Sequence, residues 1–222
     1  MITKSLRFLI FAWIMLLMST CEKGNDFPKK YVFDSYNIGV LKAYTKTGEI
    51  TDTPTINDFI AEKKNFFWQS DLQINNWHFE IEIISDTLAK ITDADTSIYY
   101  NLIRKNGIVY FQDKNRMWNS DGPLTDERLK YSPLYIRFSP YTNGGYLFIP
   151  CYYIIETSGE LHMPFASYFE KIYGSTGNLI SYQAKGNYNN VFNTTYLSKV
   201  QNSGDLIDTI VYQDNTVILK EK

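Results

Sequence analysis

The sequence predicts an all-β fold, an antiparallel β-barrel or sandwich of about ten short strands with one short N-terminal helix. Apolar and polar residues alternate over many short segments that end at turn residues, and one segment has helical periodicity. The chain holds 18 tyrosines, which are favoured on half-buried pleated surfaces. Strands do not alternate with repeated helices, so a parallel α/β sheet is not expected.

The N-terminal part predicts one strand followed by the single helix. The strand covers Tyr36–Tyr44, and a turn at residues 47–48 follows it. The helix covers Thr55–Lys63, where Thr55 and Asp58 fit a capping-box pattern. Three apolar residues share one face of this helix: Ile56, Phe59 and Ile60.

Two central segments give the clearest strand signals. Trp77–Ile84 alternates strictly, which predicts a strand with one buried and one wet face. Ser97–Arg104 and Ile108–Gln112 flank the pair Asn106-Gly107. This pair predicts a tight hairpin, because both of its turn residues need positive φ.

Six further strands are predicted, and the last four of them form a C-terminal meander. Pro150 lies inside one of them and predicts an edge or a bulge, because proline cannot donate to a ladder. A turn is expected at Asp214-Asn215. The strands are Leu134–Phe138, Tyr146–Glu156, Leu179–Lys185, Thr195–Gln201, Leu206–Gln213 and Thr216–Lys220.

The first twenty residues have the pattern of a secretory signal peptide. Lys4 and Arg7 precede Phe8–Met18, an uncharged apolar run that small residues follow. The run has eleven residues, whereas a membrane-spanning helix needs roughly 20. We therefore expect residues 1–20 to be removed on export.

The block Met18-Ser19-Thr20-Cys21 resembles the lipobox of bacterial lipoproteins. The resemblance implies that Cys21 is the lipid attachment site and the first residue of the mature protein. Two or three acyl chains would hold the protein on a membrane. The predicted organisation is a signal peptide (1–20), a lipid-anchored tether (21–30) and a single β-rich domain (31–222).

Composition excludes several functions. The net charge is −2 and no basic patch is present, so nucleic acid is not an expected partner. Only Cys151 accompanies Cys21, so no cysteine metal site is expected. Cys151 lies in an apolar run and is expected to be a small buried residue.

The N-terminal third is similar to uncharacterised lipoproteins of Bacteroidetes-type bacteria. The similarity is carried by Phe33–Tyr36 and Lys42–Asp52, followed by a short helix. Some of those proteins have lipocalin-like β-barrels, although the Gly-x-Trp signature of lipocalins is missing after Gly39. The resemblance implies a location in the cell envelope, lipid-anchored at the outer membrane.

Such bacteria attach O-glycans at Asp-Ser/Thr-apolar sequences, and the chain contains two of them. Asp86-Thr87-Leu88 and Asp208-Thr209-Ile210 make Thr87 and Thr209 candidate O-glycosylation sites. The alternative interpretation is two ordinary threonines at strand edges.

Catalytic motifs are absent from the sequence, so an enzyme is not expected. His78, Glu80 and Glu82 would share the wet face of one strand, which is typical of a solvated surface. His162 has no Gly-x-Ser-x-Gly elbow beside it, and no phosphate loop or dinucleotide fingerprint is present. Neither a metal nor another cofactor is expected.

Two functions fit these observations. The first is a binding module, an envelope-anchored barrel that holds a small apolar or glycan ligand, and it predicts a cavity. The second is a structural or accessory interaction subunit of an envelope protein complex, which predicts an exposed aromatic patch and no ligand cavity. The sequence does not choose between them.

Overall fold

The structure is a computed structural model, and it describes most of the chain from Asp26 onward. The described residues are 26–61, 67–68, 78–114, 118–120, 126–131, 135–138, 146–148, 151–173, 179–202 and 207–222.

Strands dominate the described chain. They are β1 (Lys29–Asn37), β2 (Lys42–Thr45), β3 (Gly48–Ile50), β4 (Phe79–Ser85), β5 (Leu88–Asp93), β6 (Thr96–Lys105), β7 (Ile108–Asp113), β8 (Trp118–Ser120), β9 (Tyr135–Phe138), β10 (Tyr146–Phe148), β11 (Cys151–Thr157), β12 (Glu160–Tyr173), β13 (Leu179–Tyr188) and β14 (Ile207–Glu221). The helices are α2 (Thr53–Ile60), the 3-10 helix η2 (Thr194–Leu197) and α3 (Ser198–Asn202).

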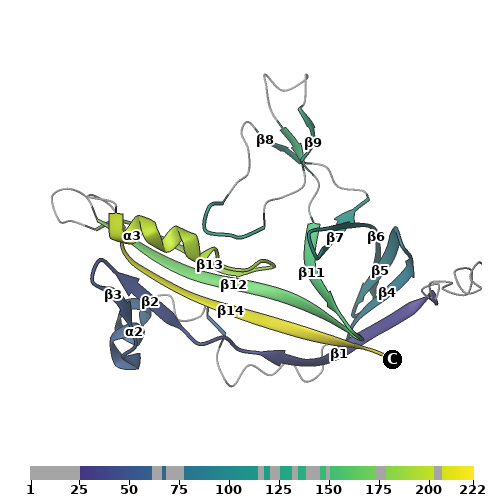
Figure 1. Ribbon diagram of the computed structural model, residues 1–222, viewed down its shortest axis with the longest axis horizontal. Helices are drawn as coiled ribbons and strands as arrows, with labels where there is room; N and C mark the ends of the chain where they lie inside the picture. Colours follow the sequence, from purple (N-terminus) through teal and green to yellow (C-terminus); the bar gives the residue numbers. More distant parts are fainter. Residues whose placement is uncertain are drawn as a thin grey trace, which may run out of the picture.

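Eight of the strands close into an antiparallel barrel. Their order is β1-β4-β5-β6-β7-β11-β12-β14, and β14 closes the ring by pairing with β1 on one side and β12 on the other. The fold is therefore an all-β barrel, as the sequence predicts, and the sandwich alternative is wrong. The barrel strands β4 to β7 and β11 gather at one end of the molecule in Figure 1.

The two longest strands continue beyond the barrel into a second sheet. There β13 pairs with β12, and β2 pairs with β14 and with β3, which gives the order β13-β12-β14-β2-β3. We call this sheet the extension. Figure 1 shows α2 and α3 on opposite sides of β12 and β14, so helices cover both faces of the extension.

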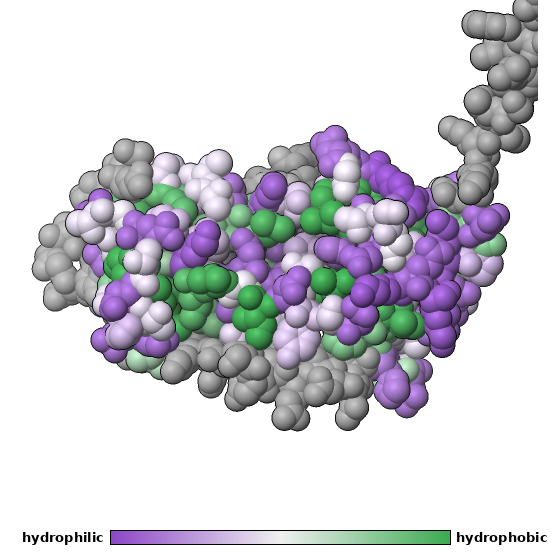
Figure 2. Space-filling model, turned by 60° about the horizontal axis from the view of Figure 1, so that its bottom comes forward, coloured by the Kyte–Doolittle hydropathy of each residue, from purple (hydrophilic) through white to green (hydrophobic). Residues whose placement is uncertain are grey.

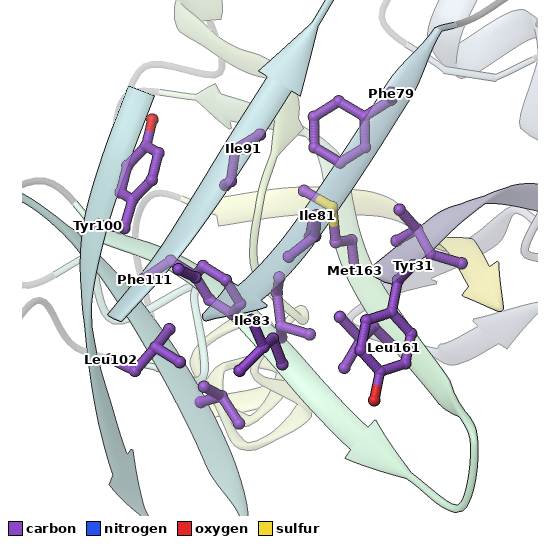
Figure 3. Close-up of a cluster of buried hydrophobic side chains, with 14 of the residues drawn as sticks. Tyr31, Phe79, Ile81, Ile83, Ile91, Tyr100, Leu102, Phe111, Leu161 and Met163 are labelled. Atoms are coloured by element: carbon purple, nitrogen blue, oxygen red, sulfur yellow. The ribbon is translucent and has the colours of Figure 1, made fainter. Parts of the chain in front are cut away.

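One large apolar cluster fills the barrel. Phe79, Ile81 and Met163 converge in its interior, with the side chains of the facing strands around them (Figure 3). Strand alternation selects these residues, because every second side chain points inward. The buried members are Tyr31, Phe79, Ile81, Ile83, Ala89, Ile91, Tyr100, Leu102, Val109, Phe111, Ile154, Leu161, Met163, Val217 and Leu219.

A single asparagine completes the barrel where two strands separate. β11 and β12 pair only over their ends near the connecting turn, from Ile155 to His162. Beyond that point the Asn189 side-chain amide donates to the carbonyls of Tyr153 (3.2 Å) and Pro164 (3.0 Å). The Asn189 carbonyl oxygen also accepts from the Tyr153 backbone N–H. Asn189 thus replaces the missing strand-to-strand hydrogen bonds.

Several sequence predictions are confirmed by the structure. The Asn106-Gly107 hairpin joins β6 to β7, with φ values of 54° and 76°. In β4 the apolar residues face inward and Glu80 and Glu82 face outward, as the alternation indicates. Trp77 lies outside the described residues.

The N-terminal boundaries differ from prediction. The predicted strand Tyr36–Tyr44 is two strands, β1 and β2, separated by an irregular segment around Gly39. β1 begins at Lys29, and Lys30 pairs with Glu82, so the folded domain starts before residue 31. The helix begins earlier than expected because Asp52, not Thr55, caps it and accepts a hydrogen bond from the Thr55 N–H at 2.9 Å.

The C-terminal meander also differs. No turn forms at Asp214-Asn215, and β14 runs without interruption, because both side chains hold neighbouring segments instead. The predicted strand Thr195–Gln201 is η2 and α3. Asn193 caps this helical segment by accepting from the Thr195 N–H. The predicted N-terminal helix is present as α2, and the described chain has a further helical segment, η2 and α3, near its C-terminal end.

Candidate functional site

The two ends of the barrel are different. Three tight turns lie at one end, which we call the hairpin end: residues 86–87, 106–107 and 158–159. The start of β1 and the chain's C-terminus lie at the same end, where the Lys222 N–H donates to the Lys30 carbonyl at 2.9 Å. The opposite end, which we call the mouth, holds the start of β4, the β5–β6 turn, the end of β7 and the start of β11.

Trp68 covers part of the mouth. Its ring lies 5.6 Å from that of Phe165 and 6.3 Å from that of Tyr36, which places it over the side formed by β12 and β1. The buried Gln213 side chain accepts from the Trp68 N–H (2.8 Å) and donates to the Trp68 carbonyl (3.2 Å). Moving Trp68 away would leave this amide without those bonds, at a cost of about 1–3 kcal/mol.

A second segment is fixed at the same place. Gln213 donates to the Gly39 carbonyl (2.9 Å), and the Gly39 N–H donates to Asn215 (3.0 Å). A Cβ on Gly39 would lie 2.0 Å from the Asp214 carbonyl oxygen, so only glycine fits. Gln213 and Asn215 therefore hold two loop segments against the mouth.

The described residues contain an open cleft of about 690 Å³ on the rim of the mouth. It extends from the β5–β6 turn to the middle of β1, and both outward-facing residues such as Glu80 and inward-facing residues such as Phe79 line it. Its lining is half polar and half apolar, with two phenylalanines, two carboxylates and a histidine. The lining residues are Val32, Phe33, His78, Phe79, Glu80, Thr92, Ala94 and Asp95.

Backbone structure fixes the polar side of this cleft. The Ala94 N–H donates to the His78 carbonyl at 2.9 Å, which ties the start of β4 to the β5–β6 turn. Glu80 forms an ion pair with Lys30 at 2.6 Å, whereas Asp95 is exposed at the turn. Carboxylates and a histidine can accept hydrogen bonds from the hydroxyl groups of a ligand. An aromatic ring beside them can stack on an apolar face of the same ligand.

The structure separates the histidine and carboxylate residues that the sequence places together. His78 and Glu80 line the cleft, but Glu82 pairs with Lys90 further along the outer face. His162 lies 2.8 Å from Glu160 near the hairpin end. Within the described part of the chain no group of three or more histidine, cysteine or acidic residues could hold a metal ion.

The candidate modification sites differ in exposure. Thr87 is exposed in the turn between β4 and β5. Thr209 is 0% exposed inside β14, where its hydroxyl donates to Asp208 at 2.7 Å, so a glycosyltransferase could not reach it in the folded protein. Cys21 lies outside the described residues. Cys151 is half-buried and packs with tyrosines on the outer face of β7 and β11.

A buried charged cluster on the extension was not predicted. Arg128 contacts Asp126 at 2.6 Å and Glu170, which is 1% exposed, at 3.0 Å. Tyr168 donates to Asp126 at 2.7 Å, and Tyr196 donates to Glu170 at 3.0 Å. Burial and the bond to Asp126 raise the pKa of Tyr168. The cluster holds the segment around Arg128 against β12. Glu170, Tyr168 and Tyr196 are too far from Arg128 in the sequence for the cluster to be recognised there.

Comparison with family models, with curated proteins and with solved structures found no significant match. The class of the protein therefore rests on its architecture, an eight-stranded antiparallel barrel that is lipocalin-like in kind. None of the helices in the described part of the chain has the length and apolar character needed to cross a membrane.

Proposed function

We propose that this protein is a lipid-anchored binding protein of the cell envelope and that the rim cleft binds a glycan without catalysing a reaction. The observation that carries this proposal is the cleft of about 690 Å³ beside a barrel interior that side chains fill. Small-molecule sites are commonly about 300–1,000 Å³ and lie at barrel mouths.

The lining favours a glycan over an apolar ligand. An apolar cargo needs an enclosed apolar cavity, but the apolar interior is occupied by the barrel's own side chains, including Phe111 and Met163. The cleft instead combines the partly buried Phe33 with the carboxylates of Glu80 and Asp95, while Phe79 belongs to the barrel core behind it. Carboxylates bind sugar hydroxyls through charge-assisted hydrogen bonds, which are stronger than neutral ones.

The proposed lipid anchor and the cleft are compatible with one orientation of the barrel relative to the membrane. Lys29, the first residue of β1, is eight residues beyond Cys21, so the chain between them spans at most about 28 Å. An acylated Cys21 would hold the hairpin end next to the membrane. Asp95, at the other end of the barrel, would face the aqueous space where glycans are found.

The alternative is an accessory subunit that binds another envelope protein through an exposed aromatic patch. On the face in Figure 2, the described hydrophobic residues are interspersed among hydrophilic ones. Such a surface favours the glycan proposal, because partner surfaces are contiguous apolar patches.

Titration with soluble oligosaccharides from envelope polymers, followed by calorimetry, tests the cleft. We expect saturable binding that weakens at least tenfold in Asp95→Ala, while Asp86→Ala, an exposed aspartate at the hairpin end, binds as the wild type does. Recovery of the sugar unchanged after incubation is expected for a binding protein. Wild-type protein that binds none of these sugars would overturn the proposal.

The anchor is tested separately by mass spectrometry of the protein from a Gram-negative host. We expect the mature protein to begin at Cys21 and to carry acyl chains, and Cys21→Ser to be released from membranes. A mature protein that begins elsewhere and carries no lipid would contradict the anchored part of the proposal.

A further inference from the structure

The inner wall of the barrel mouth carries an exposed tyrosine. In β11, Ile154 belongs to the barrel interior and Tyr153 packs on the outer face, so Tyr152 points inward. Tyr152 is nevertheless 41% exposed, because it lies where the interior opens at the mouth. Large aromatic side chains elsewhere on this inner wall are buried, including Tyr100 and Phe111.

Tyr152 is part of an ordered aromatic surface. Its ring meets that of Tyr100 edge-on at 5.7 Å, and Tyr100 meets Phe111 edge-on at 6.5 Å. Asp113 is the strand partner of Tyr100, so its carboxylate belongs to the same wall, where it is 6% exposed. A packed aromatic neighbour holds the exposed ring in place before any ligand arrives, which lowers the entropic cost of binding.

This surface lies across the mouth from the rim cleft. Phe79 of the cleft is on β4, and Tyr152 is on β11, four strands further around a ring of eight. At about 4.8 Å per strand the arc between them is about 19 Å long, so the straight distance across the mouth is about 12 Å. Among the described residues, Trp68 does not cover this wall, because its ring packs on Phe165 and Tyr36 on the other side of the mouth.

We infer that Tyr152, with Tyr100 and Asp113 beside it, forms a second sugar subsite, and that the ligand is an extended oligosaccharide. One sugar unit occupies the rim cleft, and a later unit of the same chain stacks on the Tyr152 ring. This inference rests on the proposed function of the cleft. A straight distance of about 12 Å is longer than one sugar ring, so a monosaccharide reaches only one of the two subsites.

The test compares short and long sugars on matched variants. Tyr152→Ala removes the inward ring, and Tyr99→Ala removes a tyrosine that is 50% exposed on β6, next to the inward-facing Tyr100. We expect Tyr152→Ala to bind the longest oligosaccharide about tenfold more weakly and a disaccharide unchanged. Tyr99→Ala should bind both as the wild type does. Tyr152→Phe should restore the affinity, because the stacking face is kept.

Each outcome is decisive. If Tyr152→Ala binds the long sugar with wild-type affinity while Asp95→Ala remains defective, the second subsite is wrong and the cleft proposal stands. If the wild type binds long and short sugars equally, the extended ligand is wrong. Absence of binding to every sugar overturns both proposals. Thermal melting of Tyr152→Ala checks that the barrel is folded, and Tyr152→Phe provides the same comparison with a smaller change.

Discussion

The barrel and the extension use the same two long strands in different ways. In the barrel, β12 and β14 turn one face inward, where Met163 and Val217 join a core that eight strands enclose. In the extension, Phe169 packs under α2 on one face, and Tyr168 packs with Phe192 beside η2 on the other. A closed ring shields one face of a strand by itself, whereas an open sheet needs helices on both faces.

The change between the two environments is marked by polar side chains. Ser167, Gln213 and Asn215 are all buried and lie on the strand face that is apolar on either side of them. Gln213 and Asn215 satisfy backbone groups of the segments at Gly39 and Trp68, which end the barrel core. Buried polar groups therefore separate the two cores of this one sheet.

The largest effect is expected in the barrel core. Phe111 is 0% exposed, and Phe111→Ala should lower the free energy of unfolding by about 3–5 kcal/mol, because the cavity adds to the lost burial. Tyr99→Ala, at an exposed position of β6, should cost under about 1 kcal/mol. Chemical denaturation measures both. Equal losses would mean that the barrel interior is not the close-packed core described above.

A smaller loss is expected in the extension. Arg128→Met leaves the buried Glu170 without its cation and should cost about 3 kcal/mol. The matched control is Arg104→Met, because the ion pair of Arg104 with Glu156 is about one-third exposed on both sides and should be worth at most about 1 kcal/mol.

Two probes of the unfolding of Arg128→Met test whether the barrel and the extension unfold together. Fluorescence and backbone circular dichroism should give one shared midpoint if β12 and β14 couple the two regions. Two separate transitions would show that the extension unfolds while the barrel persists.

The junction between the two regions should lose less stability than either of them. Gly39→Ala places a Cβ against the Asp214 carbonyl and should cost about 1–3 kcal/mol, because the segment must move and its bonds to Gln213 and Asn215 weaken. Gly48→Ala is the control, because it separates backbone conformation from steric contact. Gly48 has a φ of 111°, which disfavours other residues, but no atom lies within 4 Å of an added Cβ. Unfolding curves compare the two. A neutral Gly39→Ala would contradict the close approach at the mouth.

The sequence predicts the barrel strands better than the connections between regions. Local signals locate the β6–β7 hairpin, because Asn106 and Gly107 adopt the positive φ that the turn demands. The uninterrupted β14 was missed, because Asp214 and Asn215 have turn propensity, and only their contacts with distant Phe192 and Gly39 favour the strand. Alternation over residues 77–84 predicts that His78 and Glu80, two of the eight lining residues, share one wet face, but it does not predict a cleft there. Tyr152 required the fold to show which way it points.

The smallest expected effect is a difference in pH dependence between two carboxylates. Burial acts to raise the pKa of Asp126, but hydrogen bonds from Arg128 and Tyr168 outweigh it and lower the pKa below its ordinary 3.8. Asp126 thus stabilises the fold above about pH 3.8, and this contribution is lost as the pH falls through the lowered pKa. Asp126→Asn should be less stable than the wild type at pH 7, and the difference should narrow in acid.

The control is Asp34→Asn on the barrel surface. Hydrogen bonds from Lys220 and Ser35 also lower the pKa of Asp34, but its side chain is 34% exposed and pairs with a lysine that is 52% exposed, so salt screens the pair. In 1 M salt the pH-dependent difference of Asp34→Asn should disappear, while that of Asp126→Asn should persist. If salt removes both differences equally, the cluster on the extension is open to water. The extension would then be the more solvated of the two regions, and its helices would not enclose a core as the barrel does.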